Sequence, residues 1–220
     1  YKLAEDDNIG KFHGIAPFDT QTGEFTNKSA LPSYSEVISS YVFNYAKKDK
    51  DIIAITPGMC YGSMLDIFRE KLPSQFIDVG IAEEHSLVLA NSLALSSKKP
   101  IVFIYSTFMQ RGYDEILHDI ARMNGNVTLL IDRAGLVPND GISHQGVFDI
   151  AMLMSMPNVI ITSPKDAHEA NNLIYTSLNF NGPFMIRYPK CSLKYDYNEG
   201  KMLDIGSWEV LKEGEDGYII

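Results

Sequence analysis

The chain has 220 residues, a formal net charge of −9 and a pI near 5.0. Its 45% hydrophobic and 21% charged residues are typical of a globular protein that buries a core, and no uninterrupted apolar run is long enough to span a bilayer. This acidic balance lacks the basic face that a nucleic-acid partner needs. We therefore expect neither a nucleic-acid partner nor a membrane.

Cysteine usage and the chain ends set further limits. Cys60 and Cys191 are far apart and form no Cys-x-x-Cys motif, which argues against a disulfide framework or a thiolate metal site and fits a reducing compartment. The chain starts at Tyr1 rather than Met and ends on an apolar run, so we expect both ends to be cut from a longer polypeptide.

The predicted elements begin after residue 31. Residues 1–31 show no sustained period and are predicted to be an extended linker. Pro32 and Ser33 then precede apolar residues at helical spacing as far as Tyr45, which predicts a capped amphipathic helix.

Short apolar strands then alternate with helices. Strands are predicted at residues 52–56, 76–79, 101–105, 127–132, 159–162 and 184–186. Helices are predicted between them at residues 65–71, 83–97, 113–123, 148–154 and 167–180. This alternation predicts right-handed βαβ crossovers, and thus an α/β fold with a mostly parallel sheet covered by helices on both faces. After Pro189 the pattern changes, and residues 205–210 and 217–220 are predicted to be strands that start another unit.

The candidates for chemistry all lie at or just after the carboxyl ends of predicted strands. They are Glu83, Glu84, Tyr105, Phe108, Arg111, Arg133, Asp140, His144 and Arg187. Because parallel strands end at one edge of a sheet, these residues can converge on a single crevice. The loop over residues 133–147 is long for a strand-to-helix connection, and such loops are usually functional.

Each candidate also has an ordinary structural interpretation. Glu83 is either a helix-terminus charge, favoured by about 0.3–1 kcal/mol, or a placed proton-transfer group. Arg133 and Arg187 are either surface ion pairs or two guanidiniums that grip a phosphate or carboxylate. No histidine pair has metal-ligand spacing, and no Gly-x-Gly-x-x-Gly or Walker-type loop is present. The residues alone predict an α/β domain with one polar, partly cationic crevice.

Several motifs in a fixed order carry a family resemblance. They lie at residues 31–34, 78–83, 104–111, 132–135 and 140–146. On these motifs the chain resembles the 1-deoxy-D-xylulose-5-phosphate synthase family, thiamine-diphosphate enzymes of the transketolase superfamily, from about Lys11 to Pro189. The resemblance implies that residues 32–190 are the pyrimidine-binding middle domain. Residues 1–31 are then a linker from a missing amino-terminal domain, and residues 191–220 lead into the carboxyl-terminal domain.

The resemblance also implies an activity. The family makes 1-deoxy-D-xylulose 5-phosphate and CO₂ from pyruvate and D-glyceraldehyde 3-phosphate, the first step of non-mevalonate isoprenoid precursor synthesis. The implied cofactors are thiamine diphosphate and Mg²⁺. The domain that holds the metal and the diphosphate is absent here, so we expect this chain alone to be inactive. The family is typically homodimeric and occurs in bacterial cytoplasm or in plastids. The alternatives are another transketolase-like thiamine-diphosphate enzyme, or a non-catalytic module of the same fold.

On the cofactor side, the resemblance implies roles for three residues. Glu83 matches the glutamate that hydrogen-bonds the far ring nitrogen of the aminopyrimidine, which stabilises the imino tautomer that deprotonates the thiazolium carbon. Phe108 matches the aromatic residue that stacks on the aminopyrimidine, and Arg111 is expected to line the same entrance. Glu84, where the family usually has glutamine, is expected to lie further out.

On the substrate side, Tyr105, Arg133 and Arg187 match positions that bind the acceptor aldehyde and its phosphate. Asp140 and His144 are expected to be catalytic, by orienting hydroxyls or passing protons.

The chain departs from the family pattern at a few positions. Pro138 replaces a common glycine, and because proline fixes φ and removes a backbone donor, it is expected to alter the shape of the loop that carries Asp140 and His144. Lys190 replaces the usual arginine and is expected to be peripheral.

Overall fold

The computed structural model describes residues 1–7, 17–26, 30–138, 140–207 and 213–214. The start of the motif resemblance at Lys11, the predicted strand at 217–220 and residues 208–210 of the other carboxyl-terminal strand lie outside these ranges, and residues 205–207 are not in a strand. The segment expected to be extended contains a short helix, α1 (Lys2–Glu5), in which the amino terminus pairs with Glu5 at 3.3 Å.

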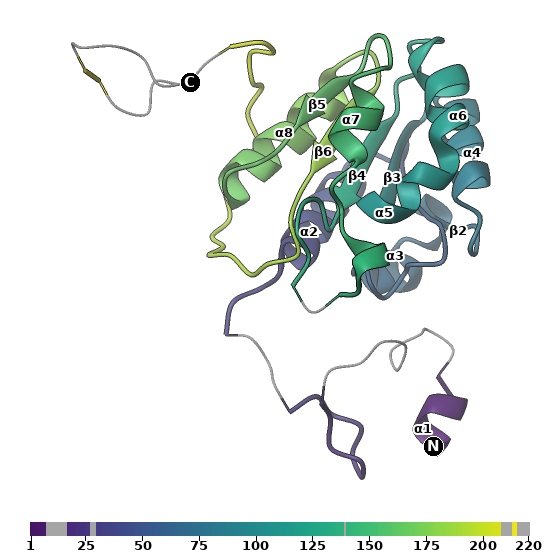
Figure 1. Ribbon diagram of the computed structural model, residues 1–220, viewed down its shortest axis with the longest axis vertical. Helices are drawn as coiled ribbons and strands as arrows, with labels where there is room; N and C mark the ends of the chain where they lie inside the picture. Colours follow the sequence, from purple (N-terminus) through teal and green to yellow (C-terminus); the bar gives the residue numbers. More distant parts are fainter. Residues whose placement is uncertain (8–16, 27–29, 139, 208–212, 215–220) are drawn as a thin grey trace.

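Six parallel strands form the sheet, in the spatial order β2-β1-β3-β4-β6-β5 (Figure 1). They are β1 (Ile52–Thr56), β2 (Phe76–Asp78), β3 (Lys99–Tyr105), β4 (Thr128–Asp132), β5 (Ile160–Thr162) and β6 (Phe184–Arg187). Every residue of β1 and β4 is buried, because helices cover both faces of the sheet. The predicted α/β fold is confirmed.

Two hydrophobic clusters hold the helices against the sheet. One cluster contains residues of α2 (Tyr34–Ala46), α3 (Asp66–Lys71) and α8 (Ala167–Asn179). The cluster on the opposite face contains residues of α4 (Glu83–Leu95), α5 (Ser106–Met109), the π-helical segment η3 (Ile116–Ala121) and α7 (Asp149–Leu153). Short segments complete the order: η1 (Pro73–Gln75), η2 (Gln110–Gly112), α6 (Tyr113–Glu115) and η4 (Ile142–His144). Within the described ranges, no helix has the length and hydropathy of a membrane span.

Local sequence signals explain where two long helices begin. Ser33 Oγ accepts the Glu36 backbone N–H at 3.2 Å, and the Glu36 carboxylate accepts the Ser33 N–H at 2.6 Å, which completes a capping box at α2. Asp166 caps α8 by accepting the Glu169 N–H at 2.8 Å. Both caps agree with the predicted helix starts.

The segments just before α2 and just after β6 lie side by side. Ser33 and Ser192 form an antiparallel bridge. The Tyr34 N–H donates to the Cys191 carbonyl at 3.0 Å, and the Leu193 N–H donates to the Pro32 carbonyl at 3.0 Å. After this bridge the chain continues along α8, where Asn171 donates to the Asn198 carbonyl at 2.7 Å and the Leu203 N–H donates to Thr176 Oγ1 at 2.9 Å.

Candidate active site

The strand ends bring the predicted residues to one edge of the sheet. Tyr105 and Asp132 are register partners at the ends of β3 and β4, and Arg187 at the end of β6 is paired with Ile131. Helix α5, which carries Phe108, starts directly after β3 and packs against α7. This arrangement agrees with the expectation that residues far apart in sequence share the carboxyl-terminal edge.

Glu83 is a buried acid at the first position of α4. Its side chain is only 5% exposed, and Oε2 makes no hydrogen bond although it lies 3.4 Å from Arg111 Nε, within ion-pair distance. The preceding turn is fixed by Asp78, whose Oδ1 accepts the N–H groups of Gly58 and Gly80 at 2.9 and 3.0 Å. Gly80 has a φ of 72°, which glycine adopts without strain. A charge that served only the helix terminus would not need to be buried, and buried polar atoms normally have a hydrogen-bond partner. Glu83 therefore differs from an ordinary helix-terminus charge.

Arg111 and Glu84 lie on the solvent-exposed side of Glu83. The Arg111 side chain is 61% exposed, and its Nη2 lies 4.0 Å from Glu84 Oε1. Glu84 is itself exposed, as expected for a residue further from the ring.

An aromatic group follows β3. The rings of Tyr105 and Phe108 are stacked, with centroids 5.6 Å apart and an interplanar angle of 10°. His144 meets the Phe108 ring edge-on at 5.6 Å, and the Arg133 guanidinium lies 4.2 Å from the centre of the Tyr105 ring. Four predicted site residues therefore touch in one continuous group.

The Tyr105 hydroxyl is buried, and it donates no hydrogen bond to any of the residues that the structure describes. Burial raises the pKa of Tyr105 to about 12, although the charge of Arg133 acts against this. The hydroxyl therefore keeps its proton at neutral pH and is a donor that the protein leaves unpaired.

Asp140 binds two cations. Arg133 Nη1 and Lys190 Nζ each donate to its carboxylate at 2.8 Å. Partial burial acts to raise the pKa of Asp140, but the Lys190 hydrogen bond and the Arg133 charge outweigh it and hold the pKa below its ordinary value. Lys190, which was expected to be peripheral, thus donates to the same carboxylate as Arg133.

Arg187 has a different partner. Its Nε donates to Asp149 Oδ2 at 2.8 Å and its Nη2 to Oδ1 at 3.3 Å. Within the described part of the chain, no hydrogen bond or ion pair joins Arg187 to Arg133 or Asp140. Arg133 and Arg187 both lie at the carboxyl-terminal edge of the sheet, but Arg133 is bonded to Asp140 and Arg187 to Asp149. Asp149 was not among the predicted residues. The sequence shows it only as an acid near the start of a predicted helix that follows the 140–146 motif, which does not indicate that it binds Arg187.

Asp132 was also missed by sequence reasoning as a candidate. Its carboxylate accepts the Ser35 hydroxyl at 2.6 Å and the Arg133 N–H at 2.6 Å. Burial raises the pKa of Asp132 to about 6 in spite of these bonds. Arg133 itself has a φ of 56°, a left-handed conformation that directs the chain away from the strand.

Gln145 organises the loop that carries Asp140 and His144. Gly135 and Gly146 exchange backbone hydrogen bonds at 2.6 and 2.9 Å, which closes the base of the loop. Inside it, Gln145 Oε1 accepts the Val137 N–H at 2.8 Å, and Nε2 donates to the carbonyls of Val137, Asp140 and Gly141 at 3.2–3.3 Å. One side-chain amide thus links both sides of the loop next to Pro138.

Two side chains of this site, Glu83 and Phe108, fit the aminopyrimidine part of thiamine diphosphate. Glu83 Oε2 is a buried oxygen available to a ring nitrogen, and Phe108 supplies an aromatic face. In the ranges that the structure describes, no three His, Cys, Asp or Glu side chains gather as a metal site. The described residues therefore fit the ring of the cofactor, and they supply no cluster for its metal.

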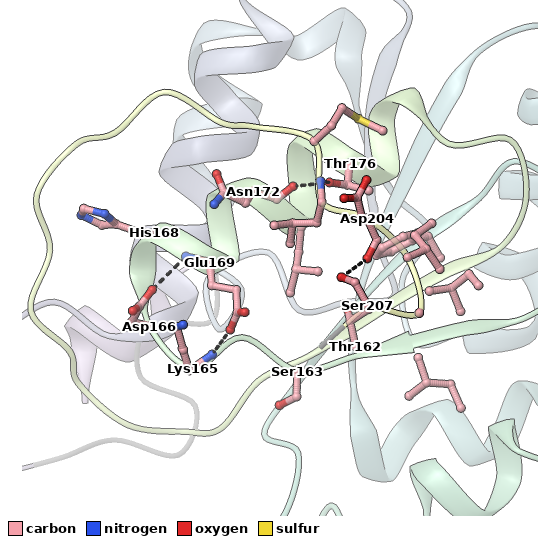
Figure 2. A pocket seen from close by; sticks show the side chains of 18 of the residues that line it. Thr162, Ser163, Lys165, Asp166, His168, Glu169, Asn172, Thr176, Asp204 and Ser207 are labelled. Carbon is pink, nitrogen blue, oxygen red and sulfur yellow. Dashed lines mark hydrogen bonds between the residues drawn. The ribbon is translucent and has the colours of Figure 1, made fainter. Parts of the chain in front are cut away.

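A cavity of about 930 Å³ lies away from this group of residues (Figure 2). It is bounded by β5, by α8 and by residues 202–207. Figure 2 shows Glu169 accepting the Lys165 N–H, and Ser207 bonded to Asp204, among its lining residues. None of the predicted site residues lines this cavity.

The comparisons with known proteins agree with this geometry. The model of the transketolase pyrimidine-binding domain matches residues 31–195. The chain belongs to the transketolase pyrimidine-binding domain family. The resemblance inferred from the motifs is confirmed.

Curated relatives in this family carry the name 1-deoxy-D-xylulose-5-phosphate synthase. The protein of Shouchella clausii is 46% identical over 224 residues, which cover 100% of this chain and 36% of the relative. The protein of Bacillus velezensis is 47% identical over 225 residues, covering 100% of this chain and 35% of the relative. The chain thus spans about a third of the length of the curated relatives it matches.

Two solved structures share the fold. A split-gene transketolase superimposes with a TM-score of 0.72 at 23% identity, over 84% of this chain and 60% of that chain. A transketolase mutant from Pichia stipitis gives 0.66 at 13% identity, over 76% of this chain and 27% of that chain.

Proposed function

We propose that the chain is the pyrimidine-binding part of a 1-deoxy-D-xylulose-5-phosphate synthase. The whole enzyme would join pyruvate to D-glyceraldehyde 3-phosphate with release of CO₂. The observation that carries the proposal is a buried carboxylate oxygen on Glu83 that accepts no hydrogen bond from the described residues, in a chain 46–47% identical over its whole length to synthases of that name. Thiamine diphosphate, when bound, would supply an acidic thiazolium carbon as the nucleophile.

Glu83 is the proton-relay residue in this proposal. Its carboxyl group would hydrogen-bond the far ring nitrogen of the aminopyrimidine and so favour the imino form of that ring. Phe108 packs on the ring face, a contact worth roughly 0.5–1.5 kcal/mol beyond burial. Arg111, exposed beside Glu83, lines the entrance.

The acceptor aldehyde is assigned to the aromatic and cationic residues. The unpaired Tyr105 hydroxyl donates to an oxygen of the acceptor, and Arg133 and Arg187 bind its phosphate as charge-assisted donors. Asp140 orients Arg133 and a substrate hydroxyl, while His144, beside Phe108, passes protons at the reacting carbon.

The remaining assignments follow from the family. We place the pyrimidine-binding domain at residues 32–190, between a linker (residues 1–31) and the start of the carboxyl-terminal domain (residues 191–220). Mg²⁺ and the cofactor's diphosphate are assigned to another domain of the whole enzyme, so this chain alone is expected to lack activity. We propose a homodimer that works in bacterial cytoplasm or in a plastid.

The test is turnover by the full-length enzyme carrying Glu83→Gln. General acid–base roles contribute roughly 10²–10⁴-fold to rate, so we expect a loss of that size with pyruvate and D-glyceraldehyde 3-phosphate. Glu84→Gln is the matched control, because this neighbouring acid is exposed, and we expect it to keep near-normal turnover. Near-normal turnover by Glu83→Gln would rule out the relay.

The same assay separates the two alternative functions. A transketolase-like enzyme of other specificity would turn over ketose donors and not pyruvate. A non-catalytic module would turn over neither in its full-length form. The buried Glu83 and the contacts among Tyr105, Phe108 and Arg133 support a working enzyme.

A further inference from the structure

Asp149 is an almost fully buried acid, and both of its carboxylate oxygens accept hydrogen bonds from one arginine. Its side chain is 1% exposed, and its two oxygens accept Nε and Nη2 of Arg187 at 2.8 and 3.3 Å. Asp149 is the first residue of α7, and Arg187 is the last residue of β6. Two residues 38 positions apart in the sequence are therefore hydrogen-bonded at the end of β6.

The pair fixes one edge of the guanidinium and leaves the other free. Arginine has five N–H donors in a rigid plane, and Asp149 takes one from Nε and one from Nη2. The other three N–H groups, including both on Nη1, make no hydrogen bond to the described part of the chain. The Arg187 side chain is 17% exposed while its acid is 1% exposed, so the open side of the pair is the arginine side.

Asp140 provides a useful contrast. It lies on a loop, is more accessible than Asp149, and divides its oxygens between Arg133 and Lys190. Arg133 and Lys190 thus share one acid, whereas Arg187 has an acid of its own. Asp149 differs because its whole carboxylate serves one guanidinium from the buried side, where a bound anion would not compete with it.

We propose that Asp149 is the positioning residue for the phosphate of the acceptor substrate: it holds Arg187 so that the free edge of the guanidinium faces that phosphate. This inference rests on the proposed function, since it takes Arg187 to be a phosphate ligand. It does not place Asp149 in contact with substrate. A purely structural pair would instead stabilise the fold and affect all substrates alike.

The experiment compares two acceptors in the full-length enzyme, D-glyceraldehyde 3-phosphate and D-glyceraldehyde, which lacks the phosphate. Asp149→Asn keeps the shape of the side chain and removes its charge. We expect KM for the phosphorylated acceptor to rise by about tenfold or more, the scale of a lost hydrogen bond to a charged group. We expect KM for pyruvate, and kcat/KM for D-glyceraldehyde, to stay within about twofold.

Arg187→Ala separates failure of the inference from failure of the proposed function. If Arg187→Ala impairs both acceptors equally, Arg187 is not a phosphate ligand and that part of the proposed function falls. If Arg187→Ala is selective for the phosphorylated acceptor but Asp149→Asn is not, only the positioning role falls.

A second variant covers loss of folding. Asp149→Glu keeps the charge but displaces it by one methylene, so we expect the same selective rise in KM, of smaller size. A wild-type ratio between the two acceptors in Asp149→Glu would overturn the proposal, whether or not Asp149→Asn folds.

Discussion

Replacing Asp132 by asparagine should remove a pH-dependent loss of stability. Burial raises the pKa of Asp132 from 3.8 to about 6. Between about pH 4 and 6 the unfolded state has lost the proton that the folded state still holds, so the free energy of unfolding falls as pH rises through this range. At about 1.36 kcal/mol for each pKa unit, the difference of about 2.2 corresponds to about 3 kcal/mol.

The asparagine is expected to keep both hydrogen bonds without the charge. Its Oδ1 can accept the Arg133 N–H, and its Nδ2 can donate to Ser35 Oγ, which replaces the present contacts of 2.6 Å each. Above pH 6.5 we therefore expect Asp132→Asn to be more stable than the parent by up to about 3 kcal/mol, with no difference in its favour near pH 4.

The measurement is equilibrium urea unfolding from pH 4 to 7.5, followed by circular dichroism. Ser35→Ala is the matched control: the Ser35 hydroxyl acts to lower the pKa of Asp132, so its loss should extend the fall in stability to higher pH. If Asp132→Asn has the same dependence on pH as the parent protein, the reasoning is refuted.

Two further substitutions test the loop and the unpaired hydroxyl. Gly146→Ala would place a methyl group against the Arg133 carbonyl oxygen, so we expect the free energy of unfolding in urea to fall by roughly 1–3 kcal/mol. Gly141→Ala is the control, because its methyl group would meet no atom within 4 Å, and it should leave the free energy of unfolding unchanged. Equal effects of the two substitutions would contradict this account of the loop. Tyr105→Phe removes a buried hydroxyl that has no partner, so the free energy of unfolding should not fall, whereas KM for the acceptor should rise by about tenfold. Tyr188→Phe removes a second such hydroxyl and should leave KM unchanged; a similar KM effect in both variants would count against the substrate role of Tyr105.

Local patterns were enough to predict the elements of the fold. Each strand is an apolar run because both faces of the sheet are covered, and Ser33 and Asp166 satisfy backbone donors within their own helix starts. The predicted helix over residues 113–123 is instead α6 followed by the π-helical η3, because periodicity does not separate α- from π-helical turns. Order in residues 2–5 was missed because so short a helix leaves no periodic signal.

The candidate site was only partly predictable. Strand ends identified Tyr105, Arg133 and Arg187, because topology alone places them at one edge. The acids that hold these cations were not identified in these roles, since the Arg187–Asp149 partnership spans 38 positions and depends on how α7 packs. The contact between Lys190 and Asp140 was missed for the same reason, because the sequence neighbours of Lys190 do not show that its amine reaches Asp140.

The bridge between Ser33 and Ser192 has a consequence for how this domain can be joined to others. The bridge holds residues 32–34 and 191–193 together, but the chain does not leave the unit there. Asn171 Nδ2 donates to the Asn198 carbonyl at 2.7 Å, and the Leu203 N–H donates to Thr176 Oγ1 at 2.9 Å, so the segment after the bridge still packs on α8. A truncation or fusion should therefore be made after residue 203 rather than at the bridge, because only then are these contacts kept.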